Sequence, residues 1–170
     1  LIASFGWQNR PMLARILRKV FYQPAQTFAE FVVEFDSAVD ECGLVEASRL
    51  IQQHFVCDMR VFGLDRLPDS AFLALSNHPG MSDTLSLFCA LNRPDLKIIA
   101  LDRPFLNALP NMSKQLFTLK DDAASRVGLV RQVTSHLRSG GAALTFPAGH
   151  IEPDPDIYEG AVDSLQTWTD

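Results

Sequence analysis

Residues 71–91 have the sequence AFLALSNHPGMSDTLSLFCAL, and this stretch decides the fold that we expect. It begins with an apolar run, residues 71–75, which has the length and composition of a buried strand. Polar and turn-forming residues follow, and an apolar helical pattern covers residues 83–91. The order is therefore strand, loop, helix, which is the repeating unit of a parallel sheet.

The same alternation of strand-like and helix-like segments continues along the chain. A second helical pattern covers residues 123–138, and further short apolar runs, each bounded by polar, glycine or proline residues, cover residues 97–101, 116–119 and 142–146. Strands that alternate with helices predict an α/β fold. We expect a mostly parallel sheet flanked by helices, with an N-terminal helical segment before it.

Three helices are expected in the N-terminal part of the chain. Residues 11–22 place apolar side chains at helical spacing, and Pro24 should end this helix. Two more helices, residues 25–42 and 44–56, are expected on either side of Gly43, which would cap the first of them.

This N-terminal part is also basic. The first 29 residues contain no acidic residue, and their charged side chains are Arg10, Arg15, Arg18 and Lys19. The aromatic residues Phe5 and Trp7 lie just upstream of the first helix. A basic amphipathic helix beside aromatic residues is typical of an interfacial membrane anchor. A helix packed on its own domain, with its basic face in water, would give the same pattern, so both interpretations stay open.

Composition excludes several classes of protein. The net charge of −5 argues against a nucleic-acid partner. The three cysteines lack the spacing of a zinc site or a disulfide framework, which favours a reducing compartment. No apolar run reaches the roughly 18 residues of a membrane-spanning helix. We therefore expect a cytoplasmic protein that is peripheral at the inner face of a membrane.

The chain has room for one domain and a helical appendage. Residues 1–57 are predicted to be the helical segment, and residues 58–170 the α/β core. Because the sequence starts at Leu1 and stops at Asp170, we expect a fragment whose core is truncated at its C-terminus.

Polar and charged residues follow each predicted strand, where open α/β sheets bind their ligands. Asn77, His78 and Asp83 follow the first strand, and Asp102 and Arg103 the second. Lys120 follows the third strand, and the segment PAGHIEPDPD, residues 147–156, follows the fourth. The sequence therefore predicts a site at this edge of the sheet.

The spacing of His78 and Asp83 is suited to proton transfer. A carboxylate five positions after a histidine can accept the imidazole Nδ1–H, which fixes the tautomer and leaves Nε2 free to take a proton. Asp83 could equally be only the cap of the following helix, with His78 an ordinary loop residue.

Several segments resemble the glycerolipid acyltransferase family, which includes lysophosphatidic acid and glycerol-3-phosphate acyltransferases. NHPGMSD, residues 77–83, is similar to its NH-x4-D block, and FPAGHIEP, residues 146–153, is similar to its FPEGTRS block. The upstream VFGLDRLPDSAFLALSNH and the intervening IIALDRPFLNALP also resemble family segments. The resemblance covers about residues 60–165.

The resemblance implies transfer of a fatty acyl group from acyl-CoA or acyl carrier protein to a hydroxyl of a lipid or glycerol-type acceptor. His78 would be the general base and Asp83 its orienting carboxylate, with backbone N–H groups near Gly149 at the oxyanion. No cofactor or metal is implied, and a membrane surface is an expected partner. The implied substrate-binding residues are Asn77, Arg103, Lys120, Phe146, Pro147, Gly149, His150 and Glu152.

The chain departs from the family pattern at several positions. Lys120 stands where the family has a phosphate-binding arginine, and Ala148 replaces the glutamate of FPEGT. His150 stands in place of threonine, and Glu152 is either a displaced carboxylate or a solvated residue. These changes leave the acceptor open.

Two other functions compete with acyl transfer. A metal-dependent hydrolase could use His78, Asp83, His150 and the acidic residues of HIEPDPD as ligands. A non-catalytic lipid-binding relative could have kept the fold while losing the chemistry.

Overall fold

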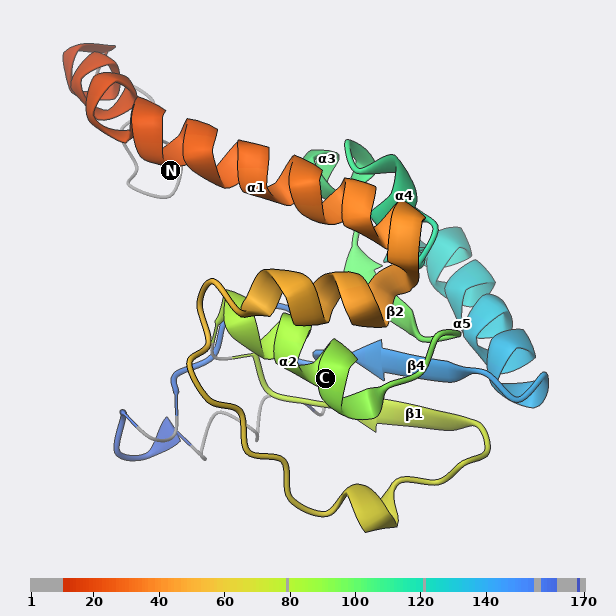
Figure 1. Cartoon of the computed structure of the whole chain (residues 1–170). Helices are drawn as coiled ribbons and strands as arrows, with labels where there is room; N and C mark the ends of the chain where they lie inside the picture. The colour runs from red at the N-terminus through yellow and green to blue at the C-terminus, as the bar shows by residue number, and fades with distance from the viewer. Residues whose placement is uncertain (1–10, 79, 121, 155–156, 162–167, 169–170) are drawn as a thin grey trace. The chain divides into compact units, whose positions relative to one another are not determined.

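Four strands form one parallel sheet in the computed structural model, which describes residues 11–78, 80–120, 122–154, 157–161 and 168 (Figure 1). The strand order is β1-β4-β2-β3. The bounds are Phe72–Leu75 for β1, Lys97–Leu101 for β2, Leu116–Leu119 for β3 and Ala142–Thr145 for β4. These are the four apolar runs of the sequence, so the predicted α/β fold class is confirmed.

Strand β4 lies inside the sheet, between β1 and β2. Phe72 pairs with Ala142, and Lys97 pairs with Ala143. Ala142, Ala143 and Leu144 have no exposed surface. Full burial explains why this strand is a continuous apolar run rather than an alternating one.

Helices connect the strands and cover the sheet. Helix α2 (Met81–Leu91) follows β1, and helix α5 (Ala123–Arg138) joins β3 to β4. Helix α5 packs on β3 and β4, burying Leu129 and Val133. The predicted helices at residues 83–91 and 123–138 are confirmed, the first with two more residues at its start.

Two short helices, α3 (Pro104–Asn107) and α4 (Pro110–Ser113), lie between β2 and β3, and a 3-10 turn (Leu64–Arg66) precedes β1. The buried carboxylate of Asp36 accepts hydrogen bonds from the backbone N–H groups of Asn111, at 3.0 Å, and Met112, at 2.7 Å. These N–H groups have no partner inside their own helix turn, so Asp36 satisfies them.

Helix α1 (Pro11–Gln52) is longer than the sequence predicts. The helix continues through Pro24, so the predicted break there is wrong. Proline removes one backbone donor, but residues 21–30 are exposed, and water can satisfy the carbonyl left without a donor. The predicted break at Gly43 is confirmed, because this residue has φ 82° and ψ 165° inside the helical run. Glycine adopts positive φ without the penalty of a Cβ.

The chain divides into two compact units, Leu1–Phe35 and Asp36–Asp170. In the first unit, Ile16, Val20 and Tyr22 are 52–67% exposed. Phe5, Trp7 and Arg10, which belong to the expected basic and aromatic region, lie outside the described residues. Among the described helices, none combines the length and apolar character needed to cross a membrane.

Replacing Gly141 with alanine is expected to lower the free energy of unfolding by about 1–3 kcal/mol, as overpacking does. An added Cβ would overlap the imidazole of His136. That ring is held in place, because its Nε2 lies 3.0 Å from the carbonyl oxygens of both Asp95 and Ala142. Urea unfolding of the two proteins measures the difference.

Gly128→Ala is the matched control for this substitution. Gly128 lies inside α5, where an added Cβ would meet no atom within 4 Å outside the helix backbone. Alanine there should stabilise the protein by about 0.5–1 kcal/mol, because it loses less backbone entropy on folding. Wild-type stability of Gly141→Ala would contradict the close packing of residue 141 on His136.

Candidate functional site

The parallel pairing of β1 with β4 brings the loops that follow these strands together. The N–H of His78 donates to the Glu152 carboxylate at 3.0 Å. The N–H of Glu152 donates to the carbonyl of His78 at 2.9 Å. Two hydrogen bonds of opposite direction therefore join the loop after β1 to the loop after β4.

The imidazole of His78 also contacts the loop after β4. It stacks on the ring of Phe146, with centroids 4.5 Å apart and planes 30° apart. Its Nδ1 atom is buried and has no hydrogen-bond partner among the described residues. The nearest acidic atom is Asp83 Oδ2, at 3.8 Å. This distance is too long for a hydrogen bond but leaves Nδ1 facing a carboxylate.

The Asp83 carboxylate lies close to both the start of helix α2 and the His78 ring. Its Oδ2 atom accepts a hydrogen bond from the backbone N–H of Gly80, the residue that precedes α2. A carboxylate in the first helical turn also interacts favourably with the helix dipole. The expectation of Asp83 as the N-cap residue is therefore wrong, because Gly80 holds that position and Asp83 binds the Gly80 N–H from the third helical position. The same carboxylate is the nearest acid to the His78 ring.

An apolar cavity of about 470 Å³ lies beside the His78 ring. Its walls include apolar side chains from α2, β2 and the following short helices, among them Phe88, Ile98, Leu106 and Met112. Six of the residues predicted for the site line this cavity: His78, Arg103, Phe146, Pro147, Gly149 and His150. The cavity is largely apolar, with its polar groups near the strand ends.

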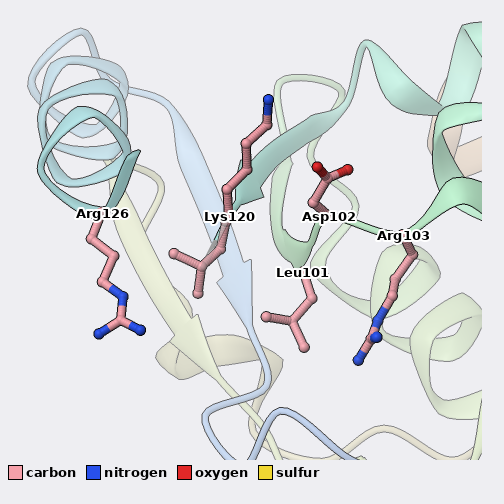
Figure 2. A pocket seen from close by; sticks show the side chains of 6 residues that line it. Leu101, Asp102, Arg103, Lys120 and Arg126 are labelled. Carbon is pink, nitrogen blue, oxygen red and sulfur yellow. The ribbon is translucent and has the colours of Figure 1, made fainter. Parts of the chain in front are cut away.

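A second hollow of about 460 Å³ lies at the ends of β2 and β3 and contains three cationic side chains, Arg103, Lys120 and Arg126. It shares Arg103, Leu101 and Leu119 with the apolar cavity. Figure 2 shows Arg103 and Arg126 pointing to the side toward which β4 runs, whereas Lys120 points the opposite way. The two guanidinium groups therefore share a direction that the Lys120 ammonium does not.

Besides Asp83, three predicted residues do not line the apolar cavity. Asn77 accepts a hydrogen bond from the Ser76 hydroxyl through its carbonyl, at 2.9 Å. Lys120 is exposed and lines only the cationic hollow. Glu152 is 3% exposed, so the expectation of a solvated residue is wrong for this position.

The loop after β4 uses its own polar groups internally. The N–H of Gly149 donates to the carbonyl of Phe146 at 3.0 Å. This donor is therefore already engaged, which weakens the expectation that Gly149 itself stabilises an oxyanion. His150 Nδ1 lies 2.7 Å from the carbonyl oxygen of Ala148.

The buried cysteine near the site, Cys89, is not suited to act as a nucleophile. Cys89, on α2, is the buried one of the three cysteines, and burial raises the pKa of its thiol. A protonated thiol is a poor nucleophile.

Among the residues that the structure describes, no three His, Cys, Asp or Glu side chains cluster as metal ligands. Asp156, part of the alternative ligand set, lies outside them.

Sequence reasoning missed Thr84 and Arg126, which line the apolar cavity and the cationic hollow respectively. Arg126 had a usable signal, because it falls in the first turns of the helix after β3, at the edge where ligands bind. Thr84 had none, since a threonine beside a capping aspartate is ordinary in a first helical turn.

Comparison with known protein families, curated proteins and solved structures found no match to this chain. The resemblance to the glycerolipid acyltransferases therefore stays a prediction. What the chain does has to be inferred from the residues around His78.

Proposed function

We propose that this chain is an acyltransferase that moves a fatty acyl group from an acyl thioester to a hydroxyl of a glycerolipid-type acceptor. One observation carries the proposal. The buried Nδ1 of His78 faces the Asp83 carboxylate at 3.8 Å, while the same ring lines an apolar cavity. A base beside an apolar chamber suits a reaction in which a hydroxyl attacks the thioester carbonyl of a bound fatty acyl group.

The chemistry follows from the two nitrogens of the imidazole. With Nδ1–H directed at Asp83, Nε2 is the basic nitrogen and accepts the proton of the acceptor hydroxyl. The hydroxyl oxygen attacks the thioester carbonyl carbon, and the carbon–sulfur bond breaks as the tetrahedral intermediate collapses. The imidazolium returns its proton to the leaving thiolate. Asp83 stabilises the imidazolium between these steps.

The distance between His78 and Asp83 must shorten during this cycle. Catalytic hydrogen bonds are often long in a ligand-free site and tighten when substrate binds. The Gly80 N–H holds the Asp83 carboxylate, so the imidazole closes the distance by turning about its side-chain bonds while the His78 backbone stays in place. The apolar walls beside the His78 ring lower the local polarity, which strengthens the attraction between the imidazolium and the carboxylate.

Recognition of an anionic group is proposed for the cationic hollow. Arg103 lines both this hollow and the apolar cavity, so an anion held there would lie next to the acyl site. Arg126 supplies a second guanidinium that points to the same side (Figure 2). Guanidinium groups bind phosphate with two parallel hydrogen bonds, which a lysine cannot do. A phosphate-bearing acceptor fits this pair.

A membrane surface is the proposed location of the acceptor. The first part of α1 exposes Ile16, Val20 and Tyr22, and it carries Arg15 and Lys19 beside them. Apolar and basic side chains on one helix favour an interface with anionic lipid. No observation favours metal-dependent hydrolysis to the same degree. A lipid-binding relative without catalysis would share every feature of the site, and the loss of transfer on replacing His78 separates the two.

His78→Ala is expected to reduce acyl transfer by at least about 10²–10⁴-fold, the usual contribution of a general base. The backbone bonds to Glu152 do not involve the ring, so the fold should survive. Thiol release from acyl-CoA and from acyl carrier protein, with acceptors present, measures the rate. Transfer near the wild-type rate in this variant would rule out the mechanism.

Asp83→Asn is expected to lower kcat by up to about 10⁴-fold through loss of the favoured histidine tautomer. The asparagine carbonyl can still accept from Gly80, so helix α2 should keep its cap. Circular dichroism together with the rate assay separates the two roles. Full activity would show that Asp83 is only a cap.

Arg126→Ala is expected to raise KM for glycerol 3-phosphate or lysophosphatidic acid by about 10-fold or more, because a charge-assisted hydrogen bond is lost. KM for a lyso-lipid without phosphate should stay the same. Arg131→Ala, on the same helix but outside the hollow, is the matched control. Equal effects of the two substitutions on every acceptor would exclude a specific role for Arg126.

A further inference from the structure

Glu152 is a buried acid whose carboxylate does not line the apolar cavity. It is 3% exposed, and one carboxylate oxygen accepts the backbone N–H of His78 at 3.0 Å. The other oxygen accepts the indole Nε1–H of Trp168 at 2.9 Å. Burying a carboxylate costs free energy unless its oxygens are hydrogen-bonded. Glu152 can therefore be buried here because His78 and Trp168 donate hydrogen bonds to it.

The backbone of Glu152 adds a third contact to the same residue. Its N–H donates to the carbonyl of His78 at 2.9 Å, so both polar groups of the His78 backbone are bound to one residue. The peptide groups on either side of the His78 Cα therefore have fixed orientations. The direction in which the imidazole leaves the backbone is fixed with them.

This constraint has a direct consequence for Nδ1. The 3.8 Å separation between Nδ1 and Asp83 is set by two anchors, the cap that holds Asp83 and the backbone that carries the imidazole. Phe146 supports the ring face, but stacking permits sliding. The bonds to Glu152 fix the backbone from which the ring extends.

We propose that Glu152 is a positioning residue, whose carboxylate is itself held by the Trp168 indole and keeps the His78 imidazole beside Asp83. Trp168 thereby connects the C-terminal part of the chain to the proposed base. The effect on catalysis rests on the proposed acyl transfer. The effect on the position of His78 does not.

The decisive experiment is NMR of the ¹⁵N-labelled full chain. It follows the hydrogen exchange of the His78 amide and the imidazole resonances of the four histidines, with His78→Ala used for assignment. The variants are Glu152→Gln, Glu152→Ala and Trp168→Phe. Glutamine has the shape of glutamate but one acceptor oxygen, so it cannot serve both N–H donors.

We expect the Glu152 variants to speed exchange of the His78 amide by about 10-fold, the size of one lost hydrogen bond. Their His78 imidazole resonances should shift, and those of His54 and His136 should not. Trp168→Phe removes the indole donor while keeping an aromatic ring, and it should shift the same His78 signals by less. In the rate assay, kcat should fall by up to about 100-fold with KM unchanged, as expected for a misplaced base.

Asp36→Asn is the matched control, because Asp36 is also a buried acid that binds backbone N–H groups. It should destabilise the protein and leave the His78 amide and imidazole signals unchanged. If Glu152→Ala does not fold, Glu152→Gln and Trp168→Phe decide the question.

The proposal is overturned if the His78 signals stay as in the wild type in the Glu152 variants. It is also overturned if Asp36→Asn moves these signals equally. A wild-type chain that transfers no acyl group would defeat the proposed function, while the NMR comparison would still test the role of Glu152.

Discussion

Two hydrogen bonds, made in opposite directions between positions 74 residues apart in the chain, join the backbone of His78 to Glu152, one through the Glu152 carboxylate and one through its backbone N–H. They extend the pairing of β1 with β4 beyond the ends of both strands. The register that pairs Leu75 with Thr145 determines which residues of the two loops meet. A slip of one residue in this pairing would turn the side chains of β1 to the other face of the sheet and separate His78 from Phe146. The position of the imidazole therefore depends on packing in the sheet as much as on the loop that carries it.

Asp83 shows how one carboxylate meets two demands. Helix α2 needs an acceptor for the free N–H groups at its start, and in the proposed mechanism the imidazole of His78 needs a fixed negative partner. Because Gly80 donates to Asp83, the carboxylate is positioned by the helix rather than by the histidine. Whatever happens to the protonation of the imidazole, the carboxylate stays in place. A structural cap is thus a suitable way to preorganise a catalytic group.

The strands and helices of the core could be predicted from sequence because each has a local cause. Short apolar runs between turn residues have few alternatives, and Gly43 marks a break through its own backbone preference. Pro24 was wrongly expected to end a helix, since the cost of a proline depends on whether water reaches the carbonyl that loses its donor. The pairing of His78 with Asp83 could be suggested from spacing, but the burial of Glu152 could not. Its partners, His78 and Trp168, are distant in the sequence, and no local pattern links them.

The loop after β4 has two tasks that cannot vary independently. Phe146, Pro147, Gly149 and His150 form part of the cavity wall, and Glu152, at the end of the same loop, holds the backbone of His78. In the proposed acyltransferase, a substitution that reshapes the wall for another acceptor would also move the carboxylate that is proposed to position the base. Mutations selected for a new substrate would then change rate and specificity together, unless the hydrogen bonds of Glu152 with His78 and Trp168 keep the carboxylate in place. The two guanidinium groups at the ends of β2 and β3 lie outside this loop, and acceptor recognition placed there can change without disturbing the base. This separation is a physical reason to place the proposed selectivity for the acceptor in the cationic hollow rather than in the loop after β4.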